Sequence, residues 1–150
     1  MRRKLQSLLR LSRHEKWILA RAWILLLMID LGLRLLPFSM IQQWTAKHGG
    51  NRRRPPTEED ASIITIHQVQ RLVDIAARHH LYPMSCLRRA LALQWLLGRQ
   101  GIVTELRIGV RKEDDTLLAH AWVEYAGQPV GEPDSAISNF ASLGTQAIHK

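Results

Sequence analysis

The hydrophobic periodicity of this chain changes at Gly101, and the change limits the folds open to it. Before this glycine, apolar residues such as Leu87, Leu91 and Leu97 recur at the spacing of a helix. After it, in IVTELRIGVRK, apolar and charged residues alternate, which is typical of a β-strand with one buried face. Because helices precede an antiparallel sheet, the order indicates an α+β fold.

Turn residues divide the part after Gly101 into further strands. The turn EDDT separates the first strand from a second one, LLAHAWVEYAG. Gly127 then marks a hairpin turn into a short third strand, QPVGEP. The tail over residues 135–150 has no clear pattern, and no element is assigned to it.

The N-terminal part, residues 1–50, is helical in character. Ser12 is followed three residues later by Glu15, which predicts a capping box at the start of a helix. The segment Trp17–Leu36 is apolar on most sides, as expected of a helix packed against a partner or against its own fold. Of these two alternatives, packing of this helix against its own fold is the favoured prediction.

A linker is predicted over Lys47–Asp60, where glycines, arginines and prolines concentrate. A further helix is expected over about 58–80, from apolar residues at helical spacing. The chain is therefore predicted to consist of a helical N-terminal region, residues 1–50, and a second domain, residues 51–150.

The formal net charge of +8 and the pI of about 10.6 favour acidic partners, namely nucleic acid, an anionic membrane surface or acidic peptides. Three consecutive arginines, Arg52–Arg54, offer phosphate contacts. No nucleic-acid-binding motif accompanies them, and aromatic residues make up only 6% of the chain. A nucleic-acid-binding protein is therefore the less favoured alternative.

A cytoplasmic location is expected. The single cysteine has no partner for an internal disulfide, which fits a reducing compartment. The uncharged run Ala22–Ile29 is far shorter than the roughly 20 residues of a membrane-spanning helix. No signal-peptidase site follows it. Contact of the N-terminal helices with a membrane surface is left open.

The one cysteine, Cys86, falls at the expected first turn of a helix. The free N–H groups and the macrodipole of a helix N-terminus stabilise a thiolate. Arg88 and Arg89 add positive charge in the same turn. The same N–H groups offer an oxyanion hole, so Cys86 is a candidate nucleophile.

A thiolate nucleophile needs an imidazole, and His120 is the favoured one of seven histidines. It lies inside an apolar strand, LAHAWVE, where a polar ring needs a partner or a function. The others are expected to be exposed or structural: His14, His48, His67, His79, His80 and His149.

A carboxylate is expected to orient the imidazole. A chain that folds back at Gly127 brings Glu132 and Asp134 beside His120, and only one of them is needed. Glu124 lies on the histidine's own strand and is a weaker candidate. No metal site is expected, because the adjacent His79 and His80 point in different directions on a helix.

These residues carry a resemblance to a known family. A cysteine that opens a helix, a strand with HAWVE and an acid after the next turn resemble the transglutaminase-like branch of papain-fold cysteine enzymes. More closely, CLRRALALQWLLGRQGIVTELRIGVRKEDDTLLAHAWVEYAGQPVGEP is similar to the stand-alone leader peptidases of lasso peptide biosynthesis. The N-terminal half resembles them in composition only.

The resemblance implies that Cys86 is the nucleophile of a cysteine peptidase and that His120 is its general base and acid. An aspartate usually completes the triad in this family. The corresponding position here is Glu132, with Asp134 the nearest aspartate, and Glu132 is slightly favoured. No cofactor is implied. The implied partners are a lasso precursor peptide, a separate protein that recognises its leader, and an ATP-dependent lasso cyclase.

A second activity is open on the same residues. Acyl transfer or amide exchange of the transglutaminase type uses the same Cys-His-acid chemistry, so the residues alone do not exclude it. The basic N-terminal residues have a further implied role, which is to hold the leader peptide: Arg2, Arg3, Lys4, Arg10 and Arg13.

Overall fold

The computed structural model describes residues 12–49, 59–80 and 83–142. Helices come first and strands follow, which confirms the predicted α+β fold. The helices are α2 (Arg13–Leu35), α3 (Phe38–Gly49), α4 (Glu59–Arg78), α5 (Cys86–Gly98) and the single turn α6 (Asp134–Ile137). The strands are β1 (Glu105–Glu113), β2 (Thr116–Tyr125), β3 (Gln128–Pro129) and β4 (Ala141–Ser142).

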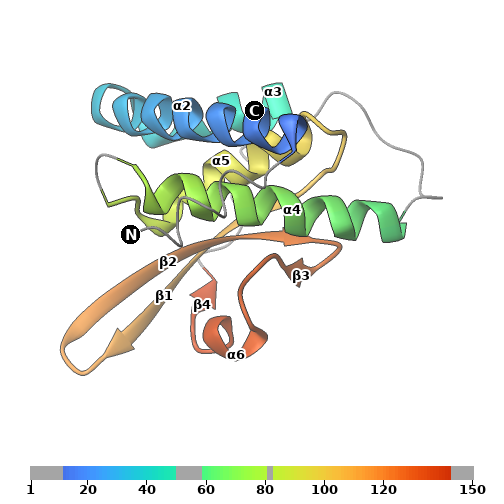
Figure 1. Ribbon diagram of the computed structural model, residues 1–150. Coiled ribbons are helices and arrows are strands. Elements are labelled where there is room, and N and C mark those ends of the chain that lie inside the picture. The colour runs from blue at the N-terminus through green and yellow to red at the C-terminus, as the bar shows by residue number, and fades with distance from the viewer. Residues whose placement is uncertain (1–11, 50–58, 81–82, 143–150) are drawn as a thin grey trace, which may run out of the picture.

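The four long helices lie on one side of a curled antiparallel sheet, and α6 lies on the other side (Figure 1). The sheet has the strand order β3-β2-β1-β4. Helix α5 is central, because it contacts α2, α3 and α4 as well as both long strands. The helix that begins with Cys86 is therefore held from several directions.

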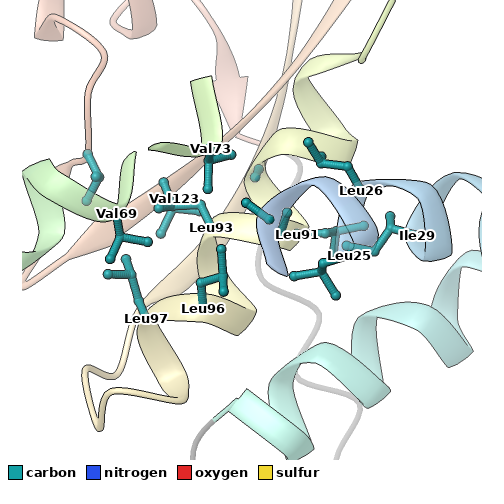
Figure 2. Packing of buried hydrophobic residues seen from close by; sticks show 14 of the residues in the cluster. Leu25, Leu26, Ile29, Val69, Val73, Leu91, Leu93, Leu96, Leu97 and Val123 are labelled. Atoms are coloured by element: carbon teal, nitrogen blue, oxygen red, sulfur yellow. The ribbon is translucent and has the colours of Figure 1, made fainter. Parts of the chain in front are cut away.

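One hydrophobic core joins the N-terminal helices to the sheet. Figure 2 shows side chains from α2, α4, α5 and β2 meeting in it. The labelled members are Leu25, Leu26, Ile29, Val69, Val73, Leu91, Leu93, Leu96, Leu97 and Val123. The packing of α2 on its own fold, favoured from the sequence, is confirmed. The predicted domain boundary near residue 50 lies outside the described residues and stays a prediction.

The start and end of α2 follow from local chemistry. The backbone N–H of Glu15 donates to the Ser12 hydroxyl over 3.1 Å, and the Ser12 N–H donates to the Glu15 carboxylate over 2.9 Å, which confirms the capping box. Leu36 is extended because it precedes Pro37, and the helix stops there.

Tight turns set the register of the strands. β1 and β2 pair around Asp114–Asp115, with Gly109 opposite His120. Ala126 and Gly127 both have positive φ angles, 50° and 78°, which is the conformation of a two-residue hairpin turn. The two predicted hairpins are confirmed.

The third strand is much shorter than predicted. β3 contains only Gln128 and Pro129, so Glu132 lies in the bend after it and Asp134 opens α6. Gly131, with a φ of 76°, turns the chain away, and Pro133 has no N–H for a sheet hydrogen bond. The prediction that the third strand extends over QPVGEP was wrong. The unassigned tail adds α6 and the edge strand β4, which pairs with β1.

Candidate active site

Cys86 is the first residue of α5, as predicted from the sequence. Ser85 is the N-cap residue, with an extended backbone, but its side chain makes no capping hydrogen bond. The first-turn N–H groups of α5 therefore receive no acceptor from Ser85. Such groups bind anionic oxygen and stabilise negative charge nearby.

A small pocket of about 50 Å³ opens beside Cys86, between α4, α5, β2 and the bend after β3. Its polar lining includes Gln70, Asp74 and Glu132, and its floor is apolar. The floor is formed by Val73, Ala90, Leu93, Val123 and Val130. The structure thus brings Cys86 and Glu132 to one cavity although they are far apart in the sequence.

Glu132 is also the acid that approaches His120. Its Oε1 lies 3.6 Å from His120 Nε2, an ion-pair distance slightly too long for a hydrogen bond. Both side chains are partly exposed, 25% for His120 and 32% for Glu132. Aromatic rings flank the imidazole, with Trp122 at 6.1 Å and Phe140 at 5.5 Å between ring centroids.

Glu124 has other partners. It accepts a hydrogen bond from Arg107 Nε over 2.9 Å and another from Trp122 Nε1 over 3.0 Å. The hydrogen bond to Glu124 raises the pKa of the Arg107 guanidinium. Of the two described acids near His120, Glu132 makes the ion-pair contact. The side chain of Asp134 lies outside the described residues.

His120 is not among the residues that line the Cys86 pocket, although Glu132, which contacts His120, and Trp122, which stacks on it, both line it. Ala121 and Val123 point into the core shared with α5, whereas His120 lies beside Trp122 and Phe140 on the opposite face. Within the described part of the chain, no hydrogen bond joins Cys86 to His120. Direct pairing of the two stays a prediction. Since β3 pairs only with Glu124 and Tyr125, the edge of β2 is not covered by β3 at His120.

Arg88 and Arg89 lie in the first turn of α5, as expected, and Arg89 lines the Cys86 pocket, but each is paired with a carboxylate. Arg88 Nη2 lies 2.7 Å from Asp30 of α2, and Arg89 forms an ion pair with Asp74 of α4. Carboxylates from two neighbouring helices thus neutralise both arginines. Through these ion pairs the two arginines hold the first turn of α5 against α2 and α4.

Two residues at the site were missed in the sequence. Gln70 of α4 lines the Cys86 pocket, and its amide lies against the backbone of Gly131, where a Cβ atom would come within 1.8 Å of it. Gly131 adopts a positive φ angle, which glycine tolerates best. The glycine itself was therefore the only signal of this turn in the sequence. Gln70 gave none, because one polar residue on a helix is ordinary.

The remaining histidines lie away from this pocket. His14, His67 and His79 are exposed, and His80 packs against Trp23 with ring centroids 5.0 Å apart. His149 and the side chain of His48 lie outside the described residues. Across residues 12–49, 59–80 and 83–142, no three His, Cys, Asp or Glu side chains come together as a metal site.

Comparison with known proteins gives one match. A family model described as the transglutaminase-like superfamily matches residues 32–145, a span that contains Cys86, His120 and Glu132. Neither the curated proteins nor the solved structures compared with the chain gave a match.

Proposed function

The chain belongs to the transglutaminase-like superfamily, and from this premise we propose that it is a cysteine peptidase that removes the leader from a lasso precursor peptide. The superfamily supports cysteine chemistry on a Cys-His-acid set. The lasso assignment is supported by the sequence resemblance between Cys86 and Glu132. The proposed partners are the precursor peptide, a separate leader-recognition protein and the ATP-dependent cyclase.

The observation that carries the proposal is the position of Glu132. One carboxylate lines the pocket beside Cys86 and approaches His120 Nε2 at 3.6 Å. Because Glu132 faces Nε2, the other ring nitrogen, Nδ1, is left to exchange a proton with the thiol. Within the described residues, Nδ1 has no hydrogen-bond partner. In this proposal Glu132, rather than Asp134, completes the triad.

In the proposed reaction, His120 removes the Cys86 proton, and the thiolate attacks the carbonyl at the leader–core junction. The first-turn N–H groups of α5 hold the oxyanion. His120 then protonates the departing amine, which frees the core peptide. Water hydrolyses the thioester and releases the leader as a carboxylate, and the free core amine becomes available to the cyclase.

The reaction requires His120 to approach Cys86 more closely than in the free enzyme. Catalytic hydrogen bonds are often long before substrate binds and tighten in the complex. β3 leaves the edge of β2 uncovered at His120, and Glu132, which contacts His120, lines the Cys86 pocket. Bound peptide along this edge would bring the two groups together.

Mass spectrometry of a matched precursor peptide, incubated with the protein and its leader-recognition partner, tests the proposal. We expect cleavage at one bond, and loss of cleavage with Cys86→Ala and with His120→Ala. Glu132→Gln should lower kcat by about a hundredfold or more, since the general base loses the group that orients its imidazole. Asp134→Asn should not.

Glu124→Gln is the matched control, because this carboxylate is close in the sheet but is bound by Arg107 and Trp122. It should leave the catalytic step largely intact. Absence of cleavage by the wild-type protein with a matched peptide and partner would refute the peptidase. A product that carries a new amide, formed with an added amine, would instead identify an acyltransferase on the same residues.

A further inference from the structure

Helix α2 carries two apolar faces, and only one of them is used by the fold. The inner face is buried in the core and contains Ile18, Ala22, Leu25, Leu26 and Ile29. The outer face carries six large apolar side chains that are between 38% and 73% exposed. These form the outer stripe: Trp17, Ile24, Leu27, Met28, Leu31 and Leu35.

The outer stripe is continuous along the helix. Residues three, four and seven apart lie on one side of an α-helix, and the members of the stripe follow this spacing. From Trp17 to Leu35 the stripe is about 27 Å long at 1.5 Å per residue. Beyond α2, exposed apolar residues continue through Leu36 to Met40 of α3. A monomeric protein rarely exposes an apolar surface of this length without a use for it.

The exposed charges beside the stripe are all positive. Arg13, Lys16 and Arg34 are exposed on α2. The two acids of the helix are engaged elsewhere, because Glu15 is bound by the Ser12 backbone and by Arg71, whereas Asp30 is buried and paired with arginines. The surface around α2 therefore combines apolar side chains with exposed positive charge, which Arg13 and Lys16 supply and to which Arg34, although paired with Asp30, adds.

We infer that this face of α2 docks on an anionic lipid bilayer. A helix with an apolar stripe and flanking Lys or Arg residues lies in the plane of the interface. Trp17 is at one end of the stripe with the Arg21 guanidinium 3.3 Å above its ring, and both side chains are favoured at the headgroup level. Within the described residues, no helix is long and apolar enough to cross a membrane, so α2 would lie on the surface.

The composition favours lipid over a protein partner. A typical protein interface is held by about ten hydrogen bonds as well as by apolar contact. The only side-chain donor in the outer stripe is the Trp17 indole, and its only acceptor is the weakly accepting sulfur of Met28. A lipid interface needs neither. Figure 1 shows α2 on the side of the helical layer away from the sheet, so docking there would leave β2 and the bend after β3 uncovered.

Flotation with vesicles tests this inference on the full-length chain. Vesicles of phosphatidylglycerol and phosphatidylcholine in equal parts are compared with vesicles of phosphatidylcholine alone. We expect the protein to float with the anionic vesicles and to be released by high salt. The triple variant Ile24→Ser/Met28→Ser/Leu31→Ser should bind about tenfold or more weakly, because the buried apolar chains are removed.

A matched control removes three equally exposed apolar side chains elsewhere, with Ile64→Ser/Val103→Ser/Leu117→Ser. This variant should float like the wild type. Arg13→Gln and Lys16→Gln should each weaken binding to the anionic vesicles about fivefold, because each removes the attraction of one cation to the anionic surface. Circular dichroism confirms that each variant is folded.

Three outcomes would overturn the inference. The first is wild-type protein that does not float with anionic vesicles. The second is equal loss of flotation in the stripe variant and the control variant. The third is a wild-type dimer that the stripe variant converts to a monomer without any change in flotation, which would assign the stripe to a second copy of the chain. Peptide cleavage is measured separately, so failure of lipid binding and failure of the peptidase are distinguishable.

Discussion

The ion pair between Asp30 and Arg88 is a strong test of how this fold is held together. Asp30 lies on α2 and its side chain is only 7% exposed. One carboxylate oxygen is 2.7 Å from Arg88 Nη2, and the other accepts a hydrogen bond from Arg34 Nε over 3.1 Å. Arg88 is two residues beyond Cys86, so this contact ties the N-terminal helix to the first turn of the candidate active-site helix.

Asp30→Asn keeps the shape of the side chain and removes its charge. Loss of one partner from a buried ion pair costs about 3 to 5 kcal/mol, because the other charge is left without compensation. Arg88 is 24% exposed and retains some hydration, so the lower end applies, about 3 kcal/mol. For a chain of this length, each kcal/mol lowers the melting temperature by about 2 to 4 °C, which gives a fall of about 6 to 12 °C.

Urea unfolding followed by circular dichroism measures the loss. Arg34→Ala is the internal control, because Arg34 is 60% exposed and its i,i+4 pair with Asp30 contributes only about 0.5 kcal/mol. The double variant Asp30→Asn/Arg88→Gln should be far less destabilised than the sum of the single variants. If Asp30→Asn unfolds within about 0.5 kcal/mol of the wild type, the pair does not hold α5 as argued.

Four further predictions concern turns, the cap of α2 and the sheet. Gly131→Ala should reduce both stability and cleavage, because its φ is 76° and the new Cβ would overlap the Gln70 side chain. Gly127→Ala is the control, with a φ of 78° and open space around it. It should cost only about 1 kcal/mol of unfolding free energy and leave cleavage unchanged. Ser12→Ala should cost about 1 kcal/mol in a thermal melt. The hydrogen bond from the Ser12 backbone, together with Arg71, lowers the pKa of Glu15 from 4.5. The stability that the Glu15 carboxylate contributes is therefore present above that pH and is lost as the pH falls below it. Glu15→Gln should flatten the acid limb of a stability–pH curve, and an unchanged limb would contradict this. Gly109→Ala should destabilise the sheet, because its Cβ would lie 2.8 Å from Phe140 and 3.0 Å from the Trp122 ring; a melting temperature equal to that of the wild type would show that these rings move aside.

Much of the architecture could be predicted from the sequence. Periodicity separated the helices from the strands, the Ser12–Glu15 spacing located the start of α2, and Gly127 located a hairpin. The position of Cys86 at a helix start was also readable, because Pro83 and Ser85 precede it. These features depend on residues close together in the chain.

The candidate site depended on contacts between distant residues. The sequence left Glu132 and Asp134 as alternatives, and the structure places Glu132 beside both His120 and the Cys86 pocket. The turn at Gly131 decides this, because it ends β3 after two residues. The roles of Arg88 and Arg89 could not be foreseen, since their carboxylate partners come from two other helices.

The sequence by itself determined where helices and strands form and where the one thiol is placed, because capping, turns and periodicity act over a few residues. Only the tertiary structure decided which charges are neutralised, which acid meets the imidazole and which face of α2 stays exposed. Ion pairs and burial join residues that are remote in the chain, and a helix that is apolar on most sides does not reveal which side the core will cover.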